Sequence, residues 1–429
     1  MSIFSLQRIQ RLLEDLGRPQ DNIPPVIHIG GTNGKGSVAA FSQRLLETSG
    51  FSAHVHTSPH LVKWNERFRL GVEKCRGRLV SDEVLVDAFC RVIQANKGQD
   101  ISTFELSVAT ALVLFSENPA DAAIIEVGLG GRLDATNIIE KPAVTVITSI
   151  SLDHERYLGN TVSLIAEEKS AIMKSGFPVV IGYQLYDEVR DLLVARAEKK
   201  GCPYRVYGDH FFVFKKDDHL IYQDEFSQRI LPIPSLLGEH QYVNAAIAIC
   251  AVEMAGFKLK EDCIKKALQS TEWHGRFQKL PAGSLLKKIP GNYEVWIDGG
   301  HNPDSGLVIS REISKFQGID KKPFYLLMGM RNDKDHAKYI QAFVELSPVV
   351  FTVPILCKED GSEPIGADPQ LLMQEATKLG IQAFACSSIM EAFDRIKQTN
   401  RGLPAPIILI GGSLYLVGEV LHKNEVYIN

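Results

Sequence analysis

A glycine-rich segment, GGTNGKGS at residues 30–37, has the composition of a phosphate-binding loop. In the common loop G-x-x-x-x-G-K-[ST], backbone N–H groups surround the phosphates, the lysine adds positive charge, and the hydroxyl after the lysine binds Mg²⁺. Here Gly36 follows Lys35, and the spacer counted from Gly30 is one residue too short. The glycines and Lys35 favour nucleotide binding over an ordinary turn between a strand and a helix. They leave open which residue holds the metal, and Ser37 is the nearest candidate.

Three further polar residues follow apolar runs and are therefore candidates for a metal site. Glu126 ends the run AAIIE, Ser58 lies in TSPHL after a short strand-like run, and His154 follows AVTVITSISLD. Because ligands of open α/β sheets gather at the carboxyl ends of the strands, these side chains should share an edge with Lys35. Mg²⁺ prefers oxygen ligands, so His154 is the weakest of the three. Each has a plainer alternative: a solvent-reaching or helix-capping glutamate, a turn serine, and a structural histidine.

Two polar loops extend this set of candidates. The loop EVGLGGRLDATN at residues 126–137 combines three glycines with charged and amide side chains, which favours substrate contact beside the phosphates over a plain surface loop. The segment DGGHNPDS at 298–305 follows another apolar run and places Asp298 and His301 at a turn. Two such edges suggest a nucleotide held across a cleft that closes. Arg276, between the two halves of the chain, is either a phosphate contact or a surface charge.

The elements that must position these residues form a repeating pattern. Short apolar runs alternate with amphipathic, helix-length stretches, as in β-α-β units around a mostly parallel sheet. The run PVIHIGG predicts a strand leading into the loop, and residues 37–50 predict the next helix, with Val38, Phe41 and Leu45 on one face. The stretch 203–236 predicts a small antiparallel sheet, because β-forming residues alternate with Gly-Asp and Asp-Asp turns. After WHGRFQ the alternating pattern restarts.

The predicted fold class is therefore α/β with two domains. Residues 1–274 should form an ATP-binding, mostly parallel sheet domain like that of phosphate-loop ATPases, with the small antiparallel sheet attached. Residues 275–429 should form a smaller, Rossmann-like C-terminal domain.

Composition excludes several other classes of protein. The 429 residues are 45% hydrophobic and 23% charged, as in ordinary globular proteins. With 47 basic and 51 acidic residues, the chain has no general attraction for nucleic acid or an anionic membrane. The seven cysteines are scattered and form no C-x-x-C pair, and no apolar run approaches the ~18 residues of a membrane span. The N-terminal residues also lack the layout of a signal peptide. We expect a cytoplasmic monomer without nucleic-acid or membrane partners.

Taken together, these segments resemble the folylpolyglutamate synthase and dihydrofolate synthase family, a branch of the ATP-dependent ligases that includes the Mur peptidoglycan ligases. The resemblance extends over nearly the whole chain. It rests on ten segments in order: GTNGKGS, TSPHLVKWNERFRL, STFE, EVGLGGRLDATN, TSISLDHERYLGNT, EEKSAIMK, GEHQYVNAA, WHGRFQ, DGGHNPDS and GSLYLVGEV. Any one segment is suggestive, whereas all of them in this order are highly specific.

The resemblance implies roles for individual residues. The implied ATP contacts are Thr32, Asn33, Gly34, Lys35, Gly36, Ser37, Asn244, Arg276 and Asp298, with His301 close to the nucleotide. The implied ligands of two Mg²⁺ ions are Ser58, Glu126 and His154. Lys169 matches a position that the family carbamylates, and it is expected to serve catalysis with Lys35, Glu126 and His154; from the residues alone it is a helix lysine in a charged run. The implied pterin and aminobenzoate site comprises Ser102, Thr103, Phe104, Glu105, Leu133, Asp134 and Ala135.

The sequence also departs from the family pattern. Ser170 and Ala171 replace a frequent Ala-Gly pair and Gly300 replaces a frequent alanine, but neither change removes a functional group. Gln278 replaces a common acidic residue. The phosphate loop starts about thirty residues into the chain, so pterin contacts from the longer N-terminal segment of many bifunctional members cannot be carried over.

The implied substrates dictate the chemistry. A carboxylate condenses with an amine only when one of its oxygens becomes a leaving group, so the γ-phosphate of ATP is expected to pass to the carboxylate of dihydropteroate or of a folate glutamyl tail. The amine of L-glutamate then attacks the acyl phosphate, with ADP and phosphate as products; Mg²⁺ and Lys35 neutralise the developing charge. One alternative is a Mur-type ligase, which would carry a further N-terminal domain. The other is a nucleotide-binding module without ligase activity.

Overall fold

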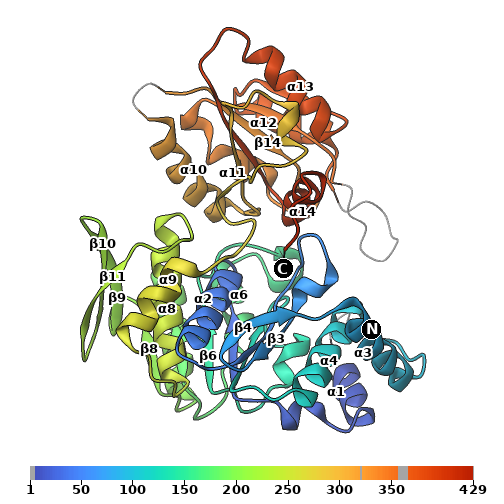
Figure 1. Ribbon diagram of the computed structural model, residues 1–429, viewed down its shortest axis with the longest axis vertical. Helices are drawn as coiled ribbons and strands as arrows, with labels where there is room; N and C mark the ends of the chain where they lie inside the picture. Colours follow the sequence, from blue (N-terminus) through green and yellow to red (C-terminus); the bar gives the residue numbers. More distant parts are fainter. Residues whose placement is uncertain (1–4, 319–320, 356–365, 429) are drawn as a thin grey trace. The chain divides into compact units, whose positions relative to one another are not determined.

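A computed structural model describes residues 5–318, 321–355 and 366–428. It divides into two compact units (Figure 1). The first extends to Ser235 and includes Glu239–Trp273, and the second comprises Leu236–Gly238 and the chain from His274 onward. The longer segment of the second unit starts at His274, next to residue 275 where the sequence predicts the second domain.

The first unit is built on an eight-stranded sheet with the order β4-β3-β2-β5-β1-β6-β7-β8. Six strands are parallel, and the hairpin β3–β4 extends the β2 edge antiparallel. The strands are β1 (Val26–Gly30), β2 (Ala53–His56), β3 (Phe68–Val72), β4 (Cys75–Leu79), β5 (Ala122–Glu126), β6 (Val144–Ile147), β7 (Val179–Ile181) and β8 (Tyr204–Val206). Because β1 lies between β5 and β6, the loops that follow these three strands meet at one edge of the sheet.

Helices cover both faces of this sheet. Helices α1, α3 and α4 pack with one another, and α2 packs with α8 and α9 (Figure 1). The helices are α1 (Leu6–Asp15), α2 (Lys35–Thr48), α3 (Asp82–Asn96), α4 (Thr103–Glu117), α5 (Glu155–Leu158), α6 (Val162–Ser170), α7 (Asp187–Lys199), α8 (Glu239–Met254) and α9 (Glu261–Ser270), with short 3₁₀ turns η1 (Pro19–Asn22), η2 (Trp64–Arg67) and η3 (Ala135–Ile138). In α2, the predicted face of Val38, Phe41 and Leu45 is fully buried.

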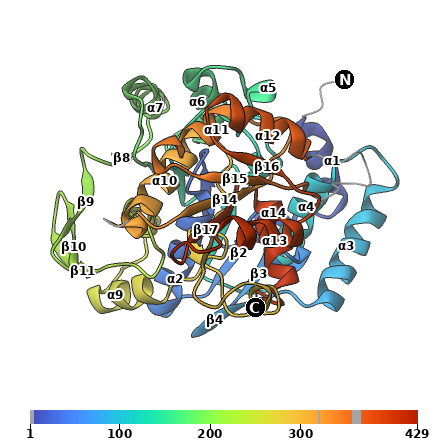
Figure 2. The ribbon, with the colours of Figure 1, turned by 90° about the horizontal axis from the view of Figure 1, so that it is seen from above.

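The small antiparallel sheet is present, with one correction to its bounds. It consists of β9 (Phe211–Lys216), β10 (His219–Asp224) and β11 (Gln228–Pro232). The sheet lies next to α8 and α9 in Figure 1 and beside α9 in Figure 2. The start of the stretch expected to be antiparallel instead forms β8, which pairs parallel with β7 in the large sheet. The hairpin β3–β4 was not expected either, because charged residues interrupt its alternation.

The second unit has a six-stranded sheet with the order β12-β13-β17-β14-β15-β16, in which β12 alone is antiparallel. Its strands are β12 (Gln278–Lys279), β13 (Glu294–Ile297), β14 (Phe324–Met328), β15 (Val349–Thr352), β16 (Ala383–Ala385) and β17 (Ile407–Gly411). Its helices are α10 (Pro303–Gln317), α11 (His336–Gln341), α12 (Pro369–Lys378), α13 (Ile389–Thr399) and α14 (Leu414–Lys423), with turns η4 (Leu286–Lys288) and η5 (Val344–Leu346). These two sheets confirm the predicted fold class.

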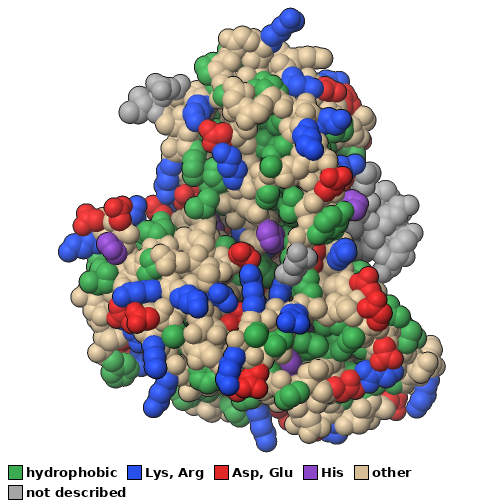
Figure 3. Space-filling view, in the orientation of Figure 1, with side chains coloured by type: hydrophobic (Ala, Val, Ile, Leu, Met, Phe, Trp, Pro, Cys, Tyr) green, Lys and Arg blue, Asp and Glu red, His purple; other side chains and the backbone are tan. Residues whose placement is uncertain are grey.

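Two surface properties bear on function. Across the described ranges, no helix is both long and apolar enough to span a membrane. On the face shown in Figure 3, basic and acidic side chains are interspersed.

Candidate active site

The glycine-rich loop joins the central strand β1 to helix α2. Gly31 and Gly34 have φ angles of 137° and 90°, which L side chains rarely adopt. A Cβ atom at Gly31 would lie only 1.9 Å from the hydroxyl oxygen of Thr148, so no larger residue fits there. Gly34 is the N-cap of α2 and offers no capping side chain. The first-turn N–H groups of α2, which have no intrahelical acceptors, and the helix dipole therefore favour an anion at this position.

Thr32 and Asn33 tie the loop to the segment that follows β6. Their backbone N–H groups donate to the carbonyl oxygen of Ser149 at 2.8 and 3.3 Å. The Thr32 hydroxyl donates to the carbonyl of Ser151 at 3.2 Å and accepts from its N–H at 3.1 Å. These bonds fix the shape of the loop, and the phosphate contacts expected of Thr32 and Asn33 stay a prediction.

Two residues distant in sequence pack directly on the loop. The side-chain oxygen of Asn244, in α8, lies 2.7 Å from where a Cβ of Gly34 would be, and its amide donates to Gln241 at 3.0 Å. The indole of Trp273 would lie 2.8 Å from a Cβ of Gly36. The structure thus brings Asn244 to the loop, whereas its expected contact with the nucleotide stays a prediction. Trp273, which the sequence analysis did not single out, packs on the same loop.

The carboxylate of Glu126 lies at the end of β5, beside the loop, and is only 5% exposed. It accepts a hydrogen bond from the N–H of Ser58 at 3.2 Å and lies 3.9 Å from Nζ of Lys35. Lys35 in turn donates to the carbonyl of Thr32 at 3.2 Å. Because β2 and β5 are parallel neighbours, the residues that follow them meet at one edge. The structure therefore brings Glu126, Ser58 and Lys35 together.

Lys169 contacts the loop directly, whereas His154 follows a segment that is hydrogen-bonded to it. His154 is the N-cap of α5, with a φ of 52°, and its side chain is 27% exposed. It follows the stretch that Ser151 ties to Thr32. Lys169, in α6, is 4% exposed, and its Nζ donates to the carbonyl of Gly31 at 2.9 Å. Lys169 is thus in direct contact with the phosphate loop.

The donor set beside the loop suits a hard divalent cation. Mg²⁺ prefers oxygen ligands and keeps several waters, so a carboxylate and a hydroxyl are sufficient protein ligands when phosphate oxygens complete the shell. If a cation binds here, Glu126 would supply the carboxylate, and Ser58 or Ser37 would supply the hydroxyl. In the part of the chain that the structure describes, no group of three or more His, Cys, Asp or Glu side chains is arranged around a metal position.

The two predicted substrate segments contact each other. Ser102 and Glu105 form a capping box at the start of α4, where the N–H of Ser102 donates to the Glu105 carboxylate at 2.8 Å. The ring of Phe104 lies over Gly128, where a Cβ would be only 2.3 Å from the ring. Arg8, in α1, forms an ion pair with Glu105, with 3.0 Å between Nη2 of Arg8 and Oε2 of Glu105. No local feature of the sequence indicated this contact of Arg8.

Asp134 closes the glycine-rich loop after β5 on itself. Its carboxylate is 5% exposed and accepts from the N–H of Leu129 at 2.9 Å. It also accepts from the N–H and the hydroxyl of Thr136, at 2.9 and 2.6 Å. Burial raises the pKa of Asp134, while these hydrogen bonds act in the opposite direction. Asp134 therefore shapes the loop that carries its neighbours Leu133 and Ala135.

The second unit gathers its three predicted residues around one turn. Asp298, directly after β13, accepts from the N–H of Phe277 at 2.7 Å and of Gly300 at 2.6 Å. His301 Nδ1 donates to the carbonyl of Gly299 at 2.8 Å. Arg276 Nη1 lies 2.9 Å from where a Cβ of Gly299 would be. Asp298, Arg276 and His301 thus meet at the carboxyl end of β13.

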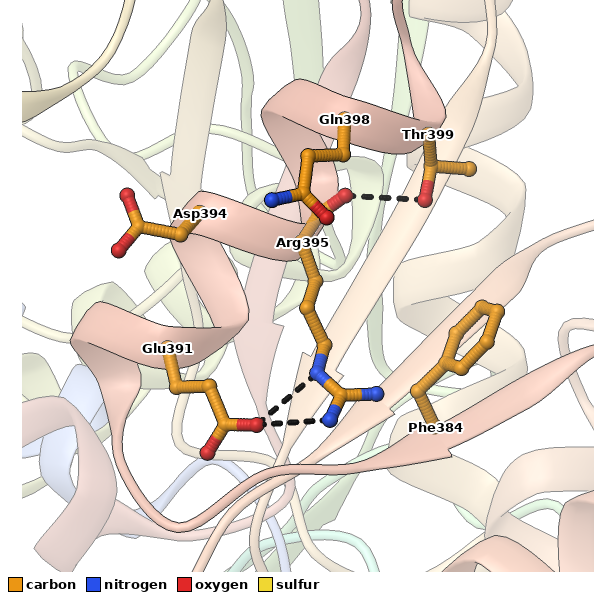
Figure 4. A pocket seen from close by; sticks show the side chains of 6 residues that line it. All are labelled: Phe384, Glu391, Asp394, Arg395, Gln398 and Thr399. Carbon is orange, nitrogen blue, oxygen red and sulfur yellow. Dashed lines mark hydrogen bonds and ion pairs between the residues drawn. The ribbon is translucent and has the colours of Figure 1, made fainter.

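A hollow elsewhere on the second unit contains none of the predicted residues. Glu391 and Arg395 of α13 point toward each other there and are joined at 2.9 Å (Figure 4). The hollow is lined by Phe384, Glu391, Asp394, Arg395, Gln398 and Thr399.

Comparison with known proteins places the chain in a class and then in a family. The family model of the Mur ligase middle domain matches residues 29–252, the part of the chain that contains the glycine-rich loop, Glu126 and Lys169. The chain is 30% identical to the folylpolyglutamate synthase of Lacticaseibacillus casei, over 96% of this chain and 93% of that protein. It therefore belongs to the folylpolyglutamate synthase and dihydrofolate synthase family of ATP-dependent ligases, which confirms the resemblance found in the sequence.

Other relatives agree with this assignment. A probable bifunctional folylpolyglutamate synthase/dihydropteroate synthase of Haloferax volcanii is also 30% identical, and the chain spans 47% of its length. E. coli FolC in complex with DHPP and ADP has a TM-score of 0.84 at 27% identity, covering 98% of this chain and 92% of that one. A bifunctional folylpolyglutamate synthase/dihydrofolate synthase with Mn, AMPPNP and L-glutamate bound has a TM-score of 0.82 at 25% identity, covering 99% and 95%.

Proposed function

We propose that this chain uses ATP and Mg²⁺ to add L-glutamate to dihydropteroate, to the glutamyl tail of tetrahydrofolate, or to both. One observation carries the proposal: the buried carboxylate of Glu126 lies 3.9 Å from Lys35 and within hydrogen-bond distance of the Ser58 N–H, at the N-terminus of α2. A carboxylate beside Lys35 and beside the helix N-terminus that would bind phosphate is suited to hold a divalent cation there. The ligands bound by FolC relatives support the same reading.

The residues of the chain have distinct parts in the reaction. Lys35 and the first-turn N–H groups of α2 bind the β- and γ-phosphates of ATP and offset the charge that develops as the γ-phosphoryl group moves to the substrate carboxylate. The amine of L-glutamate then attacks the acyl carbon, and phosphate leaves. No protein nucleophile takes part, so orientation of the three substrates is the main contribution of the site.

Glu126 and Ser58 would hold Mg²⁺, with Ser37 as the competing hydroxyl and His154 as the weakest donor. When bound, the ion neutralises phosphate charge. A second ion and carbamylation of Lys169 complete the proposal. Lys169 is suited to such a role because its Nζ touches the carbonyl of Gly31 in the phosphate loop.

The remaining predicted residues bind the rest of the substrates. Asn244 contacts the nucleotide from α8, and Arg276, Asp298 and His301 do so from the second unit. The pterin and aminobenzoate groups are contacted by Ser102, Thr103, Phe104, Glu105, Leu133, Asp134 and Ala135. The packing of Phe104 on Gly128, in the loop that leads to Leu133, supports this grouping. We also propose a cytoplasmic monomer, as the scattered, unpaired cysteines of the sequence suggest.

Product analysis tests the proposed function. Purified protein is incubated with ATP, Mg²⁺ and L-glutamate, and with dihydropteroate or tetrahydrofolate in parallel, while ADP and phosphate are measured. We expect release only when glutamate and a pterin substrate are both present, and the two parallel assays decide between one activity and two. Release of AMP and pyrophosphate would overturn the acyl-phosphate route. Turnover with neither pterin substrate would overturn the proposed substrates.

A further inference from the structure

A histidine lies buried in the middle of the central strand β1. His28 is fully buried, and it pairs in register with Ile125 of β5 and Thr145 of β6. Because alternate residues of a strand face the same side, it lies on the face of Val26, which belongs to the apolar core beneath α1, α3 and α4. An imidazole in such a core is costly unless it is hydrogen-bonded. Burial, with a smaller contribution from Lys174, lowers the pKa of His28 to about 3, so the ring is neutral near pH 7.

The hydrogen bonds of His28 have a direction that the geometry fixes. Its Nε2 lies 2.9 Å from the hydroxyl oxygen of Thr136, and that hydroxyl donates to Asp134 at 2.6 Å. Both oxygens of Asp134 also accept from backbone N–H groups, one from Leu129 and one from Thr136. Asp134 is therefore the acceptor at the end of the chain. Since the Thr136 proton is used toward Asp134, the proton between His28 and Thr136 must be carried by Nε2 of His28.

This chain of bonds ends in the loop that carries the proposed pterin site. Asp134 closes residues 129–136 on themselves, and Gly128, directly before them, packs under the ring of Phe104. The Nε2–H of neutral His28 thus donates to Thr136, which in turn donates to Asp134. Asp134 is the carboxylate that holds the backbone of that loop in place.

We propose that His28 is a positioning residue for the pterin substrate: its Nε2–H, through Thr136, holds Asp134 and so fixes the loop after β5. The substrate part of this inference rests on the proposed function. The competing explanation is that His28 only fills space in the core or supports the phosphate loop, which starts two residues later. The two explanations differ in which substrate is affected and in whether the N–H donor is needed.

Three variants separate these explanations. His28→Leu removes the donor, Thr136→Val removes the relaying hydroxyl at nearly constant shape, and His28→Gln keeps an N–H near the position of Nε2. For His28→Leu and Thr136→Val we expect the KM for the pterin substrate to rise about 10-fold, the loss of one buried hydrogen bond, with the KM for ATP changed less than about twofold. His28→Gln should restore the KM to within about threefold of the wild-type value.

Hydrogen exchange gives a second readout that needs no turnover. In His28→Leu and Thr136→Val, the amide of Leu129 should exchange faster than in the wild-type protein, while amides of β1 and α2 keep their protection. If the wild-type protein has no glutamate-dependent turnover, the proposed function fails, and exchange at Leu129 alone then decides this inference; unchanged protection overturns it. In an active protein, equal rises in both KM values, or a His28→Gln variant as impaired as His28→Leu, overturn it too. If His28→Leu does not fold, Thr136→Val decides.

Discussion

Two carboxylates at the ends of parallel strands, one in each unit, differ sharply in their surroundings. Glu126 after β5 and Asp298 after β13 are each 5% exposed. Asp298 accepts two short hydrogen bonds from backbone N–H groups, at 2.7 and 2.6 Å. At Glu126 the hydrogen bond from the Ser58 N–H is longer, at 3.2 Å, and the ammonium of Lys35 lies 3.9 Å from the carboxylate.

This difference shows that equal burial and equal topology do not give equal roles. A buried carboxylate that accepts from a backbone N–H of its own turn and from one just before a neighbouring strand stabilises that turn and its attachment to the strand, and any contact with ligand is added to this structural role. The carboxylate of Glu126, which lies 3.9 Å from Lys35 at the N-terminus of α2, is instead the proposed ligand of a cation that arrives with the substrate. Substitutions at the two positions should therefore separate stability from activity.

The largest expected effect is on the activity of Glu126→Gln. Removing the charge that faces Lys35 should lower kcat by about 10³-fold, because the loss falls on stabilisation of transferred charge. The thermal transition of the first unit should change little, since the amide oxygen can still accept from Ser58. Kinetics and calorimetry on the same preparation check both parts. Near-normal turnover would remove Glu126 from the metal site.

A smaller effect should identify which hydroxyl binds Mg²⁺ together with Glu126. Ser58→Ala should reduce activity by about 10- to 100-fold and raise the Mg²⁺ concentration needed for half-maximal rate. Ser37→Ala, in the first turn of α2, is the matched control and should leave the Mg²⁺ requirement near the wild-type value. The reverse result would assign the metal hydroxyl to Ser37 and place the ion as in the common phosphate loop.

For Asp298→Asn we expect the opposite balance between stability and activity. The neutral side chain cannot accept equally well from Phe277 and Gly300, so the second unit should lose about 1–3 kcal/mol of unfolding free energy. Activity at a temperature where the variant stays folded should fall by less than in Glu126→Gln. Chemical denaturation followed by hydrogen exchange of each unit measures the shift. An Asp298→Asn protein with unchanged stability would show that the short bonds carry no structural role.

Much of the fold could be predicted from the sequence because its signals are local. The alternation of apolar runs with amphipathic stretches predicted both sheets, and the face of Val38, Phe41 and Leu45 is buried as expected. The strand β8 was assigned to the wrong sheet, since pairing with β7 depends on residues far along the chain and leaves no local mark. The β3–β4 hairpin was missed because its charged residues obscure the period of two.

The same limit applies to the site. Glu126, Ser58 and Lys35 could be placed on one edge because strand ends in a parallel sheet must meet there. The contact of Trp273 with Gly36, the pairing of Arg8 with Glu105 across 97 residues, and the buried His28 could not, because each depends on tertiary packing. Burial also gave Asp134 a structural role that its polar loop alone did not indicate.

The smallest expected effect concerns acid. His28, His54 and His56 are buried in the first unit, whereas the described part of the second unit buries no histidine. Burial lowers the pKa of His28 to about 3 and, with Arg67, those of His56 and His60 to about 4; it also lowers that of His54. The unfolded chain therefore binds more protons than the folded unit between pH 6.5 and about 4.

It follows that the first unit is fully stabilised by these histidines above pH 6.5 and loses that stability as the pH falls toward 4. The pKa values of Asp134 and Glu253 are raised, and these two carboxyl groups therefore act in the opposite sense. They are outnumbered by the four histidines whose pKa values are lowered. Hydrogen exchange at pH 7, 6 and 5 should show the first unit opening more readily relative to the second at each step. His28→Gln should make the stability of the first unit less dependent on pH, by about the contribution of one histidine, because the glutamine amide does not titrate. Equal acid sensitivity of both units would mean that the buried histidines do not control the response.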